Sequence, residues 1–152
     1  MNPLINVNRR KLNSEYLILK TYGETAKKNK IDKVFKKAAK EIEGLNAIAV
    51  VELETGLPHG SLISDDSFDF EAACAYYAEV LKGKIKALEA MNIPGEKVEE
   101  SISKLSTQIH LLRPTSDHRF FIYLSANSAH TNLGVASNTI KNASIEISSI
   151  LG

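Results

Sequence analysis

The sequence predicts a single α/β domain, in which one five-stranded, mostly antiparallel sheet lies between helices. The chain of 152 residues has the length of one domain with a core of its own. Hydrophobic residues make up 43% of it and charged residues 24%, as in soluble globular proteins. Apolar residues recur at helical spacing in three segments, and short apolar runs of strand length lie between these segments. The predicted order is α-β-β-α-β-β-β-α.

The first helix and the residues before it come first in the chain. Residues 1–23 are interpreted as an N-terminal extension that contains at most a short strand or helix near residues 14–22. The domain then spans residues 24–152. A helix is predicted over 24–43, because Ile31, Phe35 and Ala38 fall on one helical face. Gly44 follows as its C-terminal stop.

Two strands and a long helix should follow. Residues 45–53 are almost continuously apolar, which predicts a short strand covered on both faces. A turn at 54–58, in which Gly56 takes the demanding backbone angle, leads to an antiparallel strand at 59–63. The middle helix is predicted over 67–91, with Asp66, Ser67 or Asp69 as its N-cap and Pro94 after its end.

Three more strands and a helix complete the chain. Strands are predicted at 97–106, 107–113 and 119–124, and the last of these is apolar and aromatic enough to lie centrally. The final helix is predicted over 131–150. The middle helix should cover one face of the sheet, and the first and last helices should cover the other.

At this point the chain resembles the roadblock family of the dynein light-chain type, which has a three-layer architecture like that of profilin and longin domains. The resemblance covers residues 24–152 and rests on the order of elements and three local patterns. These patterns are AIAVVELETGLP at 47–58, LLRP at 111–114, and TNLGVA at 131–136, which opens the last helix.

The resemblance implies a homodimeric interaction or scaffold module that binds or regulates a small Ras-like GTPase or a related assembly. Members of the family typically pair through a strand edge and the neighbouring middle helix. The alternative from another functional class is a small-ligand sensor, or a regulatory subunit of an enzyme, on a similar α/β sheet. A third alternative is a purely structural subunit without a GTPase partner.

The residues of the middle helix add a candidate dimer interface. A second stripe of mostly small or apolar residues lies about 130° from the main apolar stripe at 100° per residue. Gly83 within a helix costs about 1 kcal/mol relative to alanine, and close approach of a second helix would compensate for it. The alternative is that loops of the same chain cover this stripe. With the adjoining strand edge, the predicted interface consists of Ala72, Tyr76, Val80, Gly83, Ala87, Val98, Ile102 and Leu105.

Charge defines one more candidate surface. The chain has 19 Lys and Arg against 18 Asp and Glu, a balance that argues against a general nucleic-acid or membrane-surface role, since both normally require a basic excess. The first helix is nevertheless rich in lysine. Its lysines are interpreted first as a solvated face, and alternatively as a contact with an acidic partner or an anionic membrane surface. The candidates for this electrostatic contact are Lys33, Lys36, Lys37 and Lys40.

No set of residues predicts catalysis, a metal site or a cofactor. The four histidines fall in separate elements or loops, without the spacing of metal ligands, and the glycines form no phosphate-binding loop. Cys74 lies on the main apolar stripe, where a buried, inert thiol is expected. The N-terminal residues do not resemble a signal peptide, and no apolar run is long enough to span a bilayer. We therefore expect a cytoplasmic protein that is not an enzyme and has no integral membrane association.

Overall fold

The computed structural model describes residues 5–12, 15–22, 25–64 and 69–152. The elements follow the predicted order, preceded by two further strands. They are β1 (Ile5–Leu12), β2 (Glu15–Tyr22), α1 (Thr25–Glu41), β3 (Leu45–Glu52), β4 (Pro58–Ile63), α2 (Phe70–Met91), β5 (Ser101–Lys104), β6 (Gln108–Pro114), β7 (Phe120–Asn127) and α3 (Leu133–Leu151).

All neighbouring strands are antiparallel, and they form one sheet in the order β1-β2-β4-β3-β7-β6-β5. The five strands β3 to β7 are those predicted from the sequence. The sheet has seven strands instead of five because β1 and β2, from the N-terminal extension, form a hairpin that joins it. The register between β2 and β4 covers four residue pairs, from Ile18 with Ile63 to Thr21 with Gly60.

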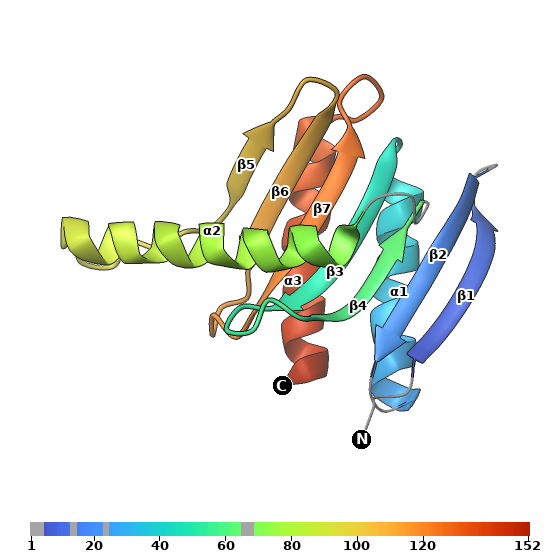
Figure 1. Cartoon of the computed structure of the whole chain (residues 1–152), viewed down its shortest axis with the longest axis horizontal. Coiled ribbons are helices and arrows are strands. Elements are labelled where there is room, and N and C mark those ends of the chain that lie inside the picture. Colours follow the sequence, from blue (N-terminus) through green and yellow to red (C-terminus); the bar gives the residue numbers. More distant parts are fainter. Residues whose placement is uncertain (1–4, 13–14, 23–24, 65–68) are drawn as a thin grey trace.

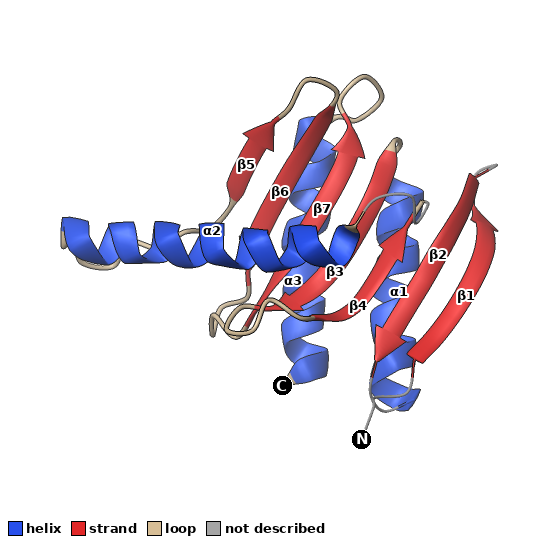
Figure 2. Ribbon diagram, viewed as in Figure 1, coloured by secondary structure: helices blue, strands red, loops and turns tan. Residues whose placement is uncertain are grey.

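The helices cover the two faces as the sequence predicted. In Figure 1, α2 crosses one face of the sheet, whereas α1 and α3 run behind it, and Figure 2 shows the same sheet between the two helical layers. The first hydrophobic cluster joins α1 and α3 to the sheet through residues such as Phe35, Leu124 and Ile140. The second joins α2 to the opposite face through residues such as Leu81 and Phe121.

Local signals set the ends of the helices and turns. Asp69, one of the three predicted caps, accepts a hydrogen bond from the Ala72 amide at 3.0 Å at the start of α2. Gly44 and Gly56 both have positive φ, as the turns after α1 and β3 require. A Cβ atom at Gly56 would lie 3.0 Å from the Ala75 Cα, so this glycine also lets the turn approach α2 closely.

Strand β5 is shorter than predicted. It comprises four residues, whereas the prediction was 97–106. Residues 97–100 belong instead to the connection that leads back from α2. In that connection Val98 packs against the cluster beneath α2, and Glu100 accepts a hydrogen bond from the Ser137 hydroxyl of α3 at 2.7 Å. These contacts with both helical layers replace regular strand pairing.

Candidate dimer and partner interface

The β5 end of the sheet is open in the described chain. Strand β5 is last in the strand order and has β6 as its only strand neighbour there. Its outer edge therefore presents backbone donors and acceptors without strand partners, a feature that proteins normally cover or pair. The edge predicted from the sequence is thus an edge in the structure.

The second stripe of α2 lies exposed beside this edge. Tyr76 is 76% exposed and Val80 is 44% exposed. Gly83 and Ala87 are also exposed, and Ala72 is half-buried. A Cβ atom at Gly83 would meet no atom within 4 Å, so no described segment of this chain approaches the glycine closely. The stripe is therefore accessible to a partner.

The three interface candidates near β5 divide between different environments. Ile102 and Leu105 are 45% and 47% exposed. Ile102 pairs with Leu111, whose side chain belongs to the α1–α3 cluster, so Ile102 lies on the face opposite α2. Val98 is half-buried beneath α2. Of these residues, Ile102 and Leu105 are available to a partner, whereas Val98 already packs within its own chain.

The C-terminal half of α2 extends beyond β5, as Figure 1 shows. The buried residues of the helix run from Phe70 to Leu81, and none of them lies in its last ten residues. Met91, at the far end, is 61% exposed, and Ile93 just after it is 45% exposed. These two residues were not among the predicted interface residues, although Met91 follows Ala87 at the four-residue spacing of one helix face.

A polar network lies beneath α2 and was not predicted. His110 Nδ1 is within hydrogen-bonding distance of the hydroxyls of Tyr77, at 2.5 Å, and Tyr123, at 3.3 Å. His110 Nε2 lies 2.7 Å from Gln108 Oε1, which also accepts a hydrogen bond from Ser125. In the neutral tautomer Nε2 donates and Nδ1 accepts. The available signal was Tyr77 on the buried stripe of α2, because a tyrosine hydroxyl usually finds a partner when buried.

Burial sets the protonation of this region. Desolvation lowers the pKa of His110, which favours the neutral imidazole that the network requires. It raises the pKa of the Tyr77 and Tyr123 hydroxyls. Burial, together with the nearby charge of Glu71, raises the pKa of the Cys74 thiol to about 12. Thiolate is scarce at neutral pH under these conditions, as expected for a structural cysteine.

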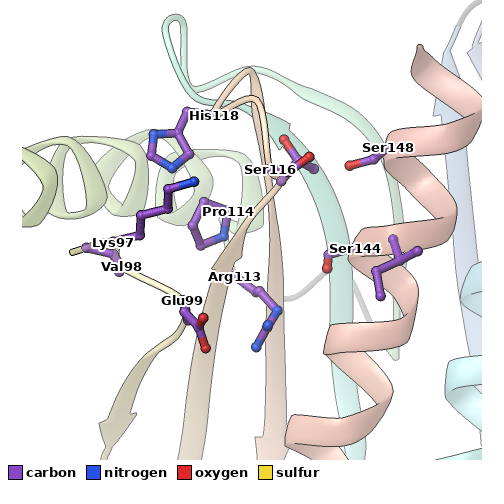
Figure 3. A pocket seen from close by; sticks show the side chains of 11 residues that line it. Lys97, Val98, Glu99, Arg113, Pro114, Ser116, His118, Ser144 and Ser148 are labelled. Atoms are coloured by element: carbon purple, nitrogen blue, oxygen red, sulfur yellow. The ribbon is translucent and has the colours of Figure 1, made fainter. Parts of the chain in front are cut away.

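A groove of about 300 Å³ lies between the loop before β5, the β6–β7 turn and α3. Figure 3 shows Lys97 and His118 on one side of this groove, and Ser144 and Ser148 of α3 on the other. Arg113 also lines it and is 3.9 Å from Glu100. The sequence analysis missed this cluster because its members come from three distant segments. Small-molecule pockets usually have volumes of about 300–1,000 Å³, so this groove is at the lower end of that range.

The lysine candidates lie on the opposite helical layer, away from α2. Lys33, Lys37 and Lys40 are exposed and Lys36 is half-buried. The Lys37 ammonium group lies 3.6 Å from a carboxylate oxygen of Glu146 on α3. The structure therefore places these residues on one surface, separate from the α2–β5 surface.

The described residues contain neither a metal-ligand cluster nor a membrane-spanning helix. Across 5–12, 15–22, 25–64 and 69–152, no three His, Cys, Asp or Glu side chains are grouped as metal ligands would be. No helix in the described part of the chain is long and apolar enough to cross a bilayer.

Comparison with solved structures identifies the fold. Myxococcus xanthus MglB matches with a TM-score of 0.74 at 16% sequence identity, over 85% of this chain and 92% of that chain. A Roadblock/LC7 domain from Streptomyces avermitilis matches with a TM-score of 0.67 at 12% identity, over 79% and 96% of the two chains. The chain has the roadblock fold.

A further roadblock-fold structure in this comparison is an MglB described as having a tetrameric arrangement. It matches with a TM-score of 0.74 at 9% identity, over 84% of this chain and 92% of that chain. Neither a protein-family model nor a curated protein matches the sequence of this chain. At these sequence identities the similarity establishes the fold, which the sequence analysis had predicted with its order of elements.

Proposed function

We propose that the chain is a homodimeric interaction module that binds or regulates a small Ras-like GTPase in the cytoplasm and has no catalytic activity of its own. The observation that carries the proposal is the exposed stripe of α2 beside the free edge of β5. Tyr76, 76% exposed, would be its aromatic anchor, since buried aromatic residues dominate the energetics of many interfaces.

In the proposed dimer, the two β5 edges pair antiparallel about a twofold axis perpendicular to the sheet. This axis places both α2 helices on one side of a continuous sheet. Figure 1 shows the half of α2 that extends beyond β5. In the proposed dimer this half would lie over the sheet of the partner copy. Gly83 lies in this half, and its missing side chain leaves room for the second helix.

The resemblance to the roadblock family supports the GTPase part of the proposal, and the roadblock fold is consistent with it. The two α2 helices would form the upper surface of the dimer, with Met91 and Ile93 exposed at the end of each helix. An apolar surface framed by charged residues is typical of a protein-binding site. We place the partner on this side of the dimer.

The absence of catalysis is supported by the chemistry of the candidate nucleophiles. A cysteine nucleophile needs a lowered pKa and an adjacent base, whereas burial raises the pKa of Cys74 to about 12. The ring nitrogens of His110 already have tyrosine and glutamine partners within hydrogen-bonding distance. Neither residue is therefore prepared for nucleophilic or base catalysis.

Assembly can be tested with two matched variants at exposed apolar residues. Tyr76→Ala removes the proposed anchor, and Leu57→Ala removes a 63% exposed residue in the β3–β4 turn. Sedimentation velocity should show a dimer that is at least about tenfold weaker for Tyr76→Ala. The Leu57→Ala protein should match the wild type. Equal effects of the two changes would contradict the proposed interface.

Partner binding needs a separate measurement. The wild-type chain is mixed with a Ras-like GTPase encoded close to it, loaded with GDP or with a non-hydrolysable GTP analogue, and the masses of the complexes are measured by light scattering. The proposal expects a complex in one nucleotide state that is much weaker in the other. No complex in either state, with the chain itself dimeric, would refute the GTPase role and leave the dimer standing.

A further inference from the structure

The outer surface of α1 is unusually uniform in its chemistry. The helix contains seven lysines and no arginine. At 100° per residue, five of these lysines fall on an arc of about 120° opposite the buried stripe. We call this surface the lysine face, and it consists of Lys30, Lys33, Lys36, Lys37 and Lys40.

Carboxylates are outnumbered by lysines in this helical layer, although two of them, Glu41 and Glu146, are exposed. Asp32 is buried, and Glu41 accepts a hydrogen bond from the Thr139 hydroxyl of α3 at 3.1 Å. Glu146 lies 3.6 Å from Lys37, so these two glutamates lie where α1 meets α3. Together α1 and α3 contain eight lysines and three acidic residues, an excess of five positive charges in a chain whose net charge is +1.

The exposed residues of α3 are mostly polar and uncharged, and the exceptions are Lys141, Glu146 and two apolar residues, Val135 and Ile145. Asn138, Asn142 and Ser149 are exposed, and Ile145 is 60% exposed. No aromatic residue occurs in α3, and Phe35, the aromatic residue of α1, is buried. The layer therefore offers spread positive charge without a large apolar anchor.

The proposed dimer, on which this inference rests, determines how two lysine faces are arranged. A twofold axis perpendicular to the sheet keeps corresponding faces on the same side, so the α1–α3 layers of both copies lie together, opposite the α2 helices. Helix α1 contacts β4, β2 and β3, and β4 is the fifth strand from the β5 edge. At about 4.8 Å between strands, the two lysine faces lie roughly 40 Å apart.

We propose that this side of the dimer binds peripherally to a bilayer surface that contains anionic lipids. Protein interfaces are enriched in arginine and aromatic residues and depleted in lysine, which is the reverse of the composition here. The two lysine faces of the proposed dimer lie roughly 40 Å apart on the same side, so an extended anionic surface can contact both at once. Each lysine close to such a surface strengthens binding by about fivefold, so five on one copy give modest affinity and ten on a dimer give much more.

The test uses the full chain and vesicles of two compositions, phosphatidylcholine alone and equal parts of phosphatidylcholine and phosphatidylserine. We expect cosedimentation with the phosphatidylserine vesicles alone, and weaker binding as salt rises from about 0.01 M to about 0.15 M. The variant Lys33→Gln with Lys40→Gln should weaken binding by at least about 30-fold. Glutamine has a helix propensity close to that of lysine, so α1 should be retained.

A matched control carries the same charge change on the other side of the sheet. Lys84→Gln with Lys86→Gln alters two exposed lysines of α2 and should leave vesicle binding close to that of the wild type. Sedimentation velocity without vesicles shows whether each protein is dimeric, which separates failure of the dimer from failure of this proposal. A wild-type dimer that does not bind phosphatidylserine vesicles at low salt would overturn it. Equal weakening by both double variants would also overturn it, as would tighter binding to duplex DNA that depends on Lys33 and Lys40.

Discussion

Replacing Gly83 with alanine should have opposite effects on the single protomer and on the dimer. In the protomer the new methyl group meets no atom within 4 Å, so nothing opposes the gain in helix propensity. That gain is about 1 kcal/mol in a helix interior. For a chain of this length it corresponds to a rise in melting temperature of roughly 2–4 °C.

In the dimer the same methyl group should be unfavourable. If the two α2 helices approach closely at Gly83, each copy adds a Cβ atom to a packed contact, and overpacking costs about 1–3 kcal/mol. A cost of about 1.4 kcal/mol is a tenfold increase in the dissociation constant. We therefore expect Gly83→Ala to form a dimer that is at least about tenfold weaker.

Two assays separate these effects. Urea unfolding at concentrations far below the dimer dissociation constant reports the stability of the protomer, and sedimentation equilibrium reports the dissociation constant. The reasoning would be refuted if Gly83→Ala dimerised as tightly as the wild type while its protomer gained the expected stability. That result would place Gly83 outside the contact.

Three further predictions follow from the polar and charged residues. Burial lowers the pKa of His110 in the folded state, so its contribution to stability is present above about pH 6.5 and is lost as the pH falls through the folded-state pKa. The free energy of unfolding in urea should therefore decrease less steeply below about pH 6.5 in His110→Gln than in the wild type. Burial of Cys74 should make its reaction with a thiol reagent depend on unfolding, and rapid labelling of the native protein would contradict its placement in the core. If the chain stimulates a GTPase, it should do so by ordering the partner's own residues, so that Arg113→Ala and Arg119→Ala retain stimulation in a single-turnover hydrolysis assay; loss of stimulation with binding intact would instead identify an arginine supplied in trans.

The elements that the sequence predicted correctly have strong local signals. The apolar runs that became β3 and β7 are central strands, and their short, nearly continuous apolar character between turns favours strands buried on both faces. The stripe through Cys74 and Leu81 fixed the buried side of α2, and Asp69 caps the helix. In these cases the local preference and the three-dimensional fold favour the same conformation.

The features that the sequence did not predict depend on contacts between distant segments. Residues 5–22 carry mixed polar and apolar residues, and their strands join the sheet through the pairing of β2 with β4, which lies about 40 positions later in the chain. The groove near Lys97 and Arg113 assembles from three separate segments. The network at His110 is similar, because Tyr77 comes from α2 and Tyr123 from β7. The spacing of residues along the chain does not reveal which distant segments come into contact.

The proposed dimer interface lies between these two cases. The second stripe of α2 was visible as a pattern, and the structure leaves it exposed. The pattern could not reveal that Val98 would turn inward beneath α2, since the loop before β5 follows contacts with both helical layers. It also could not reveal that α2 extends beyond the sheet and exposes Met91 (Figure 1).

Sedimentation equilibrium of the wild-type chain and of Gly83→Glu tests the proposed dimer most directly. We expect the wild type at micromolar concentration to have twice the protomer mass of 16.7 kDa. The Gly83→Glu protein should be folded by circular dichroism, because the site has open space around it, and should have the mass of one protomer. Its glutamate would otherwise be buried without a partner in the contact between helices. A wild-type monomer, or a folded Gly83→Glu protein that remains fully dimeric, would contradict the account.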